Sequence, residues 1–142
     1  MAEGHSRLTK QLLAWAPAVI WAALLFFLSS LSEWPGGSRF VDLPDKVVHG
    51  AFYAVLGAAL AHGRYHGAPR LPHAALIALG VLYGASDEWH QSFVPGRMAS
   101  VGDFAADAVG TALGYGVAWT IAVATLRRRS STAETEGKGR DV

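Results

Sequence analysis

The sequence contains no cysteine. A chain without cysteine forms no disulfide bond, offers no thiolate nucleophile and binds no metal ion through thiolates, and its redox compartment cannot be read from its thiols. Charged residues are also scarce, at 16% of the chain against about 25% in soluble domains. The first long apolar segment, residues 12–31, contains no charged residue at all. These deficits argue against an ordinary soluble domain.

Hydrophobic residues account for 51% of the chain and gather in four segments. As a helix, the 20 residues of segment 12–31 would be about 30 Å long, which matches the hydrocarbon core of a bilayer. Further apolar segments follow at residues 47–61, 72–86 and 104–126. The middle two reach spanning length if their polar ends lie in the membrane interface. We therefore predict an all-α integral membrane bundle of four transmembrane helices.

Two alternatives compete with this prediction. Arg7 and Lys10 precede the first segment, as basic residues do in a secretory signal peptide, but an apolar stretch of 20 residues exceeds the usual signal core of about 7–15 residues. A soluble helical bundle would show a polar face on each helix. The first and last segments are apolar on every side, so a membrane bundle is the better interpretation.

The distribution of positive charge predicts an orientation. Basic residues mark the cytoplasmic side of a membrane protein. Nine of the 12 Lys and Arg residues lie before residue 12, between residues 62 and 71, or after residue 126. The alternate loops, 32–46 and 87–103, hold the other three and are rich in acids. Both termini are therefore predicted to be cytoplasmic.

The same pattern divides the chain into three parts. Residues 1–11 are predicted to be a cytoplasmic N-terminal tail and residues 12–126 the four-helix transmembrane domain. Residues 127–142 are polar and lack apolar periodicity, so we predict a disordered basic cytoplasmic tail. Its Arg127–Arg129 run favours contact with anionic lipid, and no nucleic-acid partner is expected.

Polar residues gather at the end of the bundle that faces away from the cytoplasm. In two consecutive hairpins, the ends of the first and third helices and the starts of the second and fourth share one membrane face. Three polar pairs at four-residue spacing lie there, and such pairs project from one face of a helix. A charge at bilayer depth costs about 2.5–3.5 kcal/mol even on the insertion scale, so Asp107 should point inward and find a partner. We predict one extracytoplasmic binding site; the alternative is that its residues only cross-link helix ends. The site comprises Asp45, Lys46, His49, Asp87, Glu88, Gln91, Arg97, Asp103 and Asp107.

Arg97 follows a predicted turn at Pro95 and Gly96, two residues suited to the centre of a type II turn. The turn would fold the loop back and bring Arg97 over the acids. A guanidinium group fits a carboxylate or a phosphate through two parallel hydrogen bonds. Arg97 therefore either neutralises neighbouring acids or grips an anionic headgroup.

Catalytic and metal chemistry have weaker support. Glu88 with His90 or His49 would make an acid–base pair, but the sequence has no G-x-S-x-G nucleophile elbow and no zinc-binding H-E-x-x-H. Carboxylates and histidines suit Mg²⁺, Ca²⁺ or Zn²⁺, yet the D-E-W-H spacing is not that of a known metal site. We assign no catalytic residue firmly, and predict no metal and no cofactor.

Small residues recur at every fourth position of the last apolar segment. Such a ridge lets two helix backbones approach closely. It either packs helices within one chain or forms the seam of a homodimer. The ridge consists of Ala106, Gly110, Gly114, Ala118 and Ala122.

Four stretches together carry a family resemblance. They are FLSSLSEWP closing the first segment, DKVVHGAFYAVLG opening the second, SDEWHQSFVPGRMASVGD after the third and DFAADAVGTALG entering the fourth. With these stretches, residues 12–126 resemble the VanZ-like membrane proteins of bacteria. This chain departs from the family at Asp107, where the family often has Asn, and at Leu31 and Ser32, where it often has Gln-Pro.

The resemblance implies a multi-pass protein of the bacterial cytoplasmic membrane and cell envelope. The family takes its name from a member that gives low-level resistance to teicoplanin, a lipid-tailed glycopeptide, but no reaction, cofactor or ligand is attached to it. The residues carried over by motif are Asp45, Lys46, His49, Asp87, Glu88, Gln91, Pro95, Arg97, Asp103 and Gly110.

Three functions fit these observations. The favoured one is a non-catalytic envelope protein whose site binds a membrane lipid, through an anionic headgroup, or a lipid-tailed glycopeptide. The second is a small membrane enzyme that acts on a lipid or lipid-linked substrate, with Glu88 and His90 as acid and base. The third is a transporter or flippase subunit, for which one four-helix unit is small unless it oligomerises.

Overall fold

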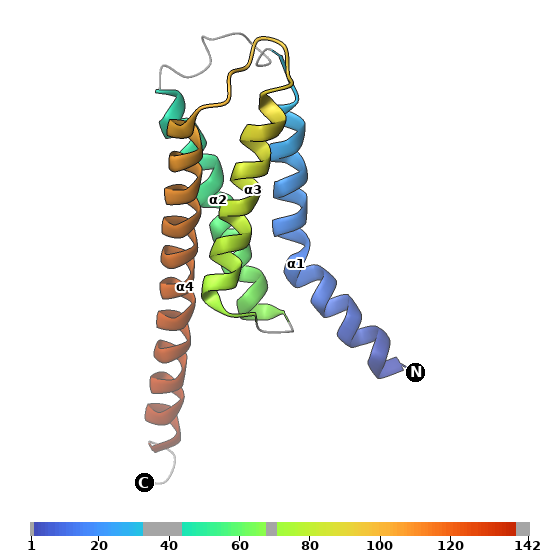
Figure 1. Ribbon diagram of the computed structural model, residues 1–142. Helices are drawn as coiled ribbons and strands as arrows, with labels where there is room; N and C mark the ends of the chain where they lie inside the picture. The colour runs from blue at the N-terminus through green and yellow to red at the C-terminus, as the bar shows by residue number, and fades with distance from the viewer. Residues whose placement is uncertain (1, 33–43, 68–70, 139–142) are drawn as a thin grey trace.

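The described part of the chain folds into four α-helices (Figure 1). The computed structural model describes residues 2–32, 44–67 and 71–138, with side chains from residue 7 to residue 132 within those ranges. No strand occurs in these ranges, so the all-α prediction is confirmed for them. The helices are α1 (Ala2–Ser29), α2 (Asp45–His66), α3 (His73–Gln91) and α4 (Val101–Lys138).

Prolines precede two of the helices, and a glycine shapes the turn after α3. Helices α2 and α3 begin directly after Pro44 and Pro72, because a proline ring fixes φ at a value compatible with helix entry and needs no N–H partner. After α3 the chain turns at Gly96, which has a φ of +82°, and Arg97 N donates a hydrogen bond to Val94 O at 3.1 Å. A positive φ at the third position is the mark of a type II turn. The predicted turn is confirmed.

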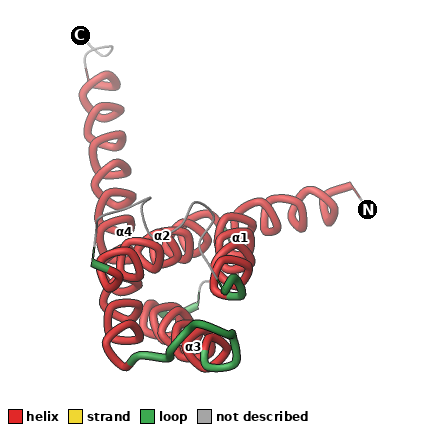
Figure 2. Tube along the Cα trace, turned by 90° about the horizontal axis from the view of Figure 1, so that it is seen from above, coloured by secondary structure: helices red, strands yellow, loops and turns green. Residues whose placement is uncertain are grey.

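Helix α1 bends, and Figure 1 and Figure 2 show its N-terminal part swinging away from the other helices. Pro17 lies inside α1, where it removes one backbone hydrogen bond and crowds the preceding turn. Beyond the bend, α1 packs on α2, and Trp21 Nε1 donates a hydrogen bond to Phe52 O at 2.8 Å. The bend therefore leaves the C-terminal part of α1 beside the candidate site.

Two of the four helices are long and apolar enough to cross a membrane. They contain the segments Arg7–Ser29, with 23 residues and a mean hydropathy of 2.1, and Val101–Thr132, with 32 residues and a mean hydropathy of 1.5. Helices α2 and α3 carry more polar residues near their ends and do not meet the same criteria. A bundle in which all four helices cross the membrane, with both termini cytoplasmic, stays a prediction.

Helix α2 lies between α1 and α4 (Figure 2), and its contact with α4 is the most extensive in the fold. Small residues bring the two backbones together. A Cβ atom on Gly114 would overlap the carbonyl oxygen of Ala54, and one on Gly110 would overlap that of Gly50. A Cβ atom on Gly57 would in turn overlap the backbone of α4. The helices touch backbone to backbone, which only small residues permit.

The predicted small-residue ridge is therefore used inside the chain. Gly110 and Gly114 contact α2 of the same molecule, so packing within one chain is confirmed at these two positions. A homodimer through the remaining ridge residues stays a prediction.

Helix α4 does not stop at the end of its apolar segment. It continues through residues 127–138, where the polar composition predicts disorder. Ser130 Oγ donates to Arg127 O at 2.9 Å, so this serine bonds back onto the helix instead of competing with it. Helix α1 likewise begins within the predicted tail 1–11, and residues 139–142 lie outside the described residues.

We predict that Gly114→Ala destabilises the fold by about 1–3 kcal/mol, because the added methyl group meets α2 backbone atoms, which cannot rotate away as a flexible side chain would. The matched control is Gly116→Ala on the same helix, where a Cβ atom would meet nothing within 4 Å. The control should leave stability unchanged or raise it, since alanine favours helix. Thermal unfolding in detergent compares the two variants; equal effects would contradict the close α2–α4 contact.

Candidate functional site

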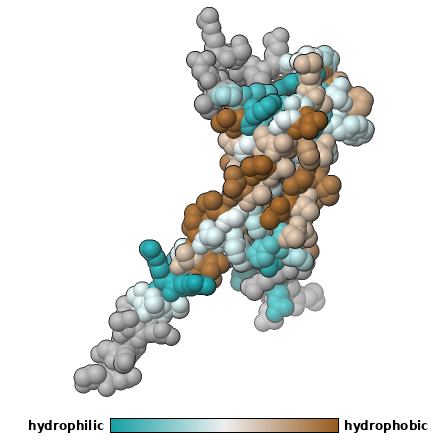
Figure 3. Space-filling view, turned by 60° about the vertical axis from the view of Figure 1, so that its left-hand side comes forward, coloured by the Kyte–Doolittle hydropathy of each residue, from teal (hydrophilic) through white to brown (hydrophobic). Residues whose placement is uncertain are grey.

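The nine residues predicted to form a site all lie at one end of the bundle, where α1 and α3 finish and α2 and α4 begin (Figure 1). We call this set the polar end. Figure 3 shows hydrophilic surface at this end and hydrophobic surface across the middle of the face that it draws. Asp45 and Lys46 are exposed, and His49 and Arg97 are partly buried. The buried members are Asp87, Glu88, Gln91, Asp103 and Asp107.

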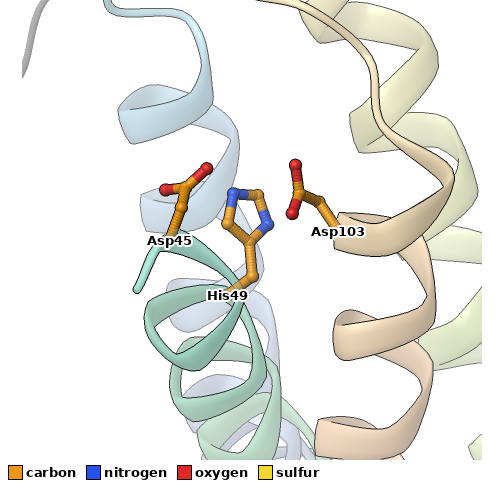
Figure 4. A group of neighbouring side chains, drawn as sticks. All are labelled: Asp45, His49 and Asp103. Carbon is orange, nitrogen blue, oxygen red and sulfur yellow. The ribbon is translucent and has the colours of Figure 1, made fainter. Parts of the chain in front are cut away.

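Two polar contacts join α2 to α4. Lys46 Nζ donates to Asp103 Oδ1 at 3.0 Å. One turn deeper, His49 Nδ1 lies 3.1 Å from Asp107 Oδ1. Figure 4 shows the His49 ring between Asp45 of its own helix and Asp103 of α4. Asp107 is fully buried, so its predicted inward orientation and its need for a partner are confirmed.

Helix α3 adds two acids. Glu88 Oε1 lies 3.9 Å from His49 Nδ1, while Glu88 Oε2 accepts a hydrogen bond from Ser100 N at 2.7 Å. Asp87 Oδ2 accepts a hydrogen bond from Gln91 Nε2 at 3.1 Å, within one of the predicted four-residue pairs. The His49 ring therefore has carboxylates of α3 and α4 beside the same nitrogen atom.

Arg97 lies at the α1 side of the polar end. Its Nε donates to Leu31 O at 3.2 Å, which ties the turn after α3 to the end of α1. Its side chain also lines a cavity of about 30 Å³, roughly the volume of one water molecule. Arg97 and Asp87 both line this cavity. This placement is expected if the turn folds the loop back over the acids. Its polar lining consists of Ser29, His49, Tyr53, Asp87, Gln91 and Arg97.

The structure separates the suggested acid–base pair of Glu88 and His90. Residues two apart on a helix do not face each other. His90 points to α1, where its Nε2 lies 3.0 Å from Ser30 Oγ and its ring stacks on Phe26 at 4.6 Å between centroids. Ser30 Oγ donates its own hydrogen to Phe26 O at 2.7 Å. The serine oxygen is then left to accept a hydrogen bond from His90 Nε2. His49 is the histidine beside Glu88.

Five buried side-chain oxygen atoms of the described residues have no hydrogen-bond partner. A buried polar atom left without a partner costs about 1–3 kcal/mol. Native proteins keep such atoms rare, so their concentration at one end of a bundle makes that end a candidate place for water, an ion or a ligand to bind. The atoms are Tyr53 Oη, Asp87 Oδ1, Glu88 Oε1, Asp107 Oδ2 and Thr111 Oγ1. Of these residues, Tyr53 and Asp87 interact with each other.

Tyr53 and Thr111 are absent from the predicted site because both lie inside apolar segments. A signal for them does exist in the sequence. Tyr53 follows His49 by four residues, and Thr111 follows Asp107 by four, so each continues a polar row one turn deeper. The site therefore extends further into the bundle than its charged residues indicate.

Two glycines of α3 make room for this deeper layer. A Cβ atom on Gly84 would lie 3.1 Å from Asp107 Cβ and 3.3 Å from Tyr53 Cε1. One on Gly80 would crowd the Thr111 methyl group in the same way. A larger residue at either position would push α4 or the Tyr53 ring away from α3.

An apolar groove of about 350 Å³ lies on the face formed by α1, α2 and α3. The lining residues nearest the polar end are Ala22 and Tyr83, which are joined by a hydrogen bond of 2.6 Å from the tyrosine hydroxyl to the alanine carbonyl oxygen. Tyr83 precedes Asp87 of the polar cavity by one helical turn. The rest of the lining includes Trp15, Val19, Leu56, Leu60, Leu76 and Leu79.

The described residues define an all-α helical protein with a buried polar site at one end of its bundle. The chain belongs to the VanZ/LLP1 family, whose model matches residues 14–123. The match includes the whole polar end, and the resemblance read from the four motifs is confirmed. No curated protein and no solved structure matches the chain. Family membership and the two apolar helices together indicate an envelope membrane protein.

We predict that Thr111→Val leaves the fold as stable as the wild type or stabilises it by up to about 1 kcal/mol, because the substitution removes a buried hydroxyl that has no partner. Thr120→Val is the control, since the Thr120 hydroxyl is exposed and bonds Val117 O. Thermal unfolding of both variants in detergent provides the comparison. A loss above about 1 kcal/mol for Thr111→Val alone would mean that the hydroxyl has a partner in the folded protein.

Proposed function

We propose that this protein binds a membrane lipid, with a phosphate-bearing headgroup at the polar end and an acyl chain in the apolar groove. One observation carries the proposal: the two surfaces follow each other along the same helices. Helices α1 and α3 line the groove with Ala22 and Tyr83. Two turns further on α1 and one turn further on α3, Ser29 and Asp87 line the small cavity that Arg97 also lines. An amphiphilic ligand needs an apolar surface and a polar surface next to each other.

Arg97 is the group best placed for the phosphate. Arg97 lines the cavity and is partly buried, and guanidinium groups bind phosphate through paired, charge-assisted hydrogen bonds. Asp87, which lines the same cavity, offers carboxylate oxygens as acceptors. They favour a headgroup that also brings donors, such as the hydroxyls of phosphatidylglycerol or the ammonium of phosphatidylethanolamine. Phosphatidylcholine has neither a hydroxyl nor an N–H group in its headgroup, so it cannot donate such a hydrogen bond.

A lipid-tailed glycopeptide presents the same combination of a donor-rich head and an acyl chain. Displacement of bound phosphatidylglycerol by teicoplanin would show that the site also accepts this class. The phospholipid is the primary proposal, because it alone supplies the phosphate that Arg97 fits.

The proposed function places all four helices across the membrane, with the polar end outside and both termini in the cytoplasm. Helices α2 and α3, at 22 and 19 residues, are about 33 and 29 Å long, close to the hydrocarbon thickness. Large apolar side chains on these helices are exposed, including Val55 at 45% and Leu82 at 67%. Such exposure suits contact with lipid. The basic residues near Arg64 and beyond residue 126 then meet the cytoplasmic face.

We predict that Arg97→Ala weakens phosphatidylglycerol binding about tenfold or more, since a charge-assisted hydrogen bond contributes about 1.5–3 kcal/mol. Lipid retention in nanodiscs, followed by native mass spectrometry, measures the change. The effect should shrink at high salt, which screens the guanidinium–phosphate attraction. Wild-type protein should retain phosphatidylglycerol and phosphatidylethanolamine over phosphatidylcholine.

The control is Arg7→Ala, which removes an exposed cation from the other end of α1 and should leave retention unchanged. A second variant, Leu79→Trp, fills the groove and should lower retention with Arg97 intact. Equal retention by wild type, Arg97→Ala and Leu79→Trp would rule out the proposed binding mode.

We predict that a cysteine at position 98 is labelled by a membrane-impermeant maleimide added to intact cells, whereas one at position 130 is protected. Met98 is 87% exposed beside the polar end, and Ser130 is exposed near the C-terminal end of α4. The chain has no native cysteine, so no background label arises from it. The opposite labelling pattern would reverse the proposed orientation.

A further inference from the structure

We infer that His49, Glu88 and Asp107 form a binding site for one divalent transition-metal ion, for which Zn²⁺ is the suitable probe. The site goes beyond the proposed lipid binding and does not depend on it. Its three ligands come from three different helices, α2, α3 and α4, at the inner side of the polar end.

The distances between the three side chains fit a metal ion. A tetrahedral Zn²⁺ ion holds nitrogen and oxygen ligands at about 2.0–2.2 Å, which places neighbouring ligand atoms about 3.3–3.6 Å apart. His49 Nδ1 lies 3.1 Å from Asp107 Oδ1 and 3.9 Å from Glu88 Oε1. The candidate ligand atoms of all three residues lie within 4.8 Å of one another. Small side-chain movements would complete the coordination.

The hydrogen bonding of these residues is incomplete without an added group. Glu88 and Asp107 are 7% and 0% exposed, and Glu88 Oε1 and Asp107 Oδ2 have no partner. The His49 Nδ1 atom carries at most one hydrogen and cannot satisfy carboxylates on both sides. A metal ion bound to Nδ1 of the neutral ring, with the ring proton on Nε2, would accept lone pairs from all three side chains. It would also offset two buried negative charges.

The chemistry of the ligands indicates which kind of ion binds and which of two residue groups binds it. An imidazole nitrogen favours Zn²⁺ and its first-row neighbours over Mg²⁺ and Ca²⁺, which prefer oxygen ligands alone. Asp45, His49 and Asp103 also place candidate ligand atoms close together (Figure 4). In that outer group, however, Asp103 already accepts a hydrogen bond from Lys46 and Asp45 is exposed to solvent. The carboxylate oxygens without a hydrogen-bond partner belong to Glu88 and Asp107 of the inner group.

The test must exclude a second place where Zn²⁺ would bind. His62 and His66 lie at the other end of α2 with ring centroids 4.5 Å apart, and two histidines on one helix face capture zinc readily. The background for the test is therefore the full chain in detergent with His62→Gln and His66→Gln. Isothermal titration calorimetry with Zn²⁺ measures binding, and the shift of the unfolding temperature on adding Zn²⁺ is the second readout.

In this background we expect one Zn²⁺ ion per chain and a raised unfolding temperature. Glu88→Gln should weaken binding at least about tenfold, since even loss of an outer-shell partner usually costs about 10–100-fold in metal affinity. Asp45→Asn is the matched control, because it removes an acid from the outer group alone, and it should bind Zn²⁺ as the background does.

No Zn²⁺ binding in the background protein would overturn the inference. Binding lost in Asp45→Asn but kept in Glu88→Gln would overturn it too, because the ion would then occupy the outer group. Should Glu88→Gln fail to fold, Asp107→Asn removes a different inner carboxylate at constant size and gives the same comparison. Phosphatidylglycerol retention by protein that binds no zinc would leave the lipid proposal standing, so the two can fail separately.

Discussion

The backbone contact between α2 and α4 is the constraint on which the rest of the structure depends. Helices that pack through large side chains keep their axes about 8–10 Å apart, and an aspartate side chain reaches only a short way across such a gap. Gly110 and Gly114 let α4 touch the backbone of α2. That approach sets Asp107 against His49 and Asp103 against Lys46. Without it, the acids of α4 would face the apolar interior without partners.

The sequence predicts those features that follow from local chemistry or from the cost of charge in a membrane. The cost of a buried charge predicts the inward Asp107, and Pro-Gly dipeptide geometry predicts the turn that brings Arg97 back over the bundle. The alternation of basic and acidic loops predicts that polar residues from all four helices gather at one end. Each of these depends on a short stretch of chain or on a simple physical penalty, so no knowledge of packing is needed.

Features that depend on packing between helices could not be predicted. Glu88 and His90 are close in sequence, yet the helix turns them to opposite sides, and only the structure shows that His49 is the histidine beside Glu88. A ligand set drawn from α2, α3 and α4 has no linear spacing, so a search for metal motifs misses it. Tyr53 and Thr111 lie in apolar segments and become polar-site residues only because α3 presents glycines to them. Helix α4 likewise continues beyond residue 126, although the composition there is typical of disorder.

Together these features describe a helical bundle of the VanZ/LLP1 family with buried oxygen atoms that lack hydrogen-bond partners among the described residues. The central claim is that the polar end and the groove hold one lipid. An experimental structure in phosphatidylglycerol nanodiscs tests it most directly. The account predicts phosphate density within hydrogen-bond distance of the Arg97 guanidinium group and acyl-chain density in the groove between α1 and α3. Lipid density confined to the Arg127–Arg129 end, with none near Arg97 and none in the groove, would contradict it.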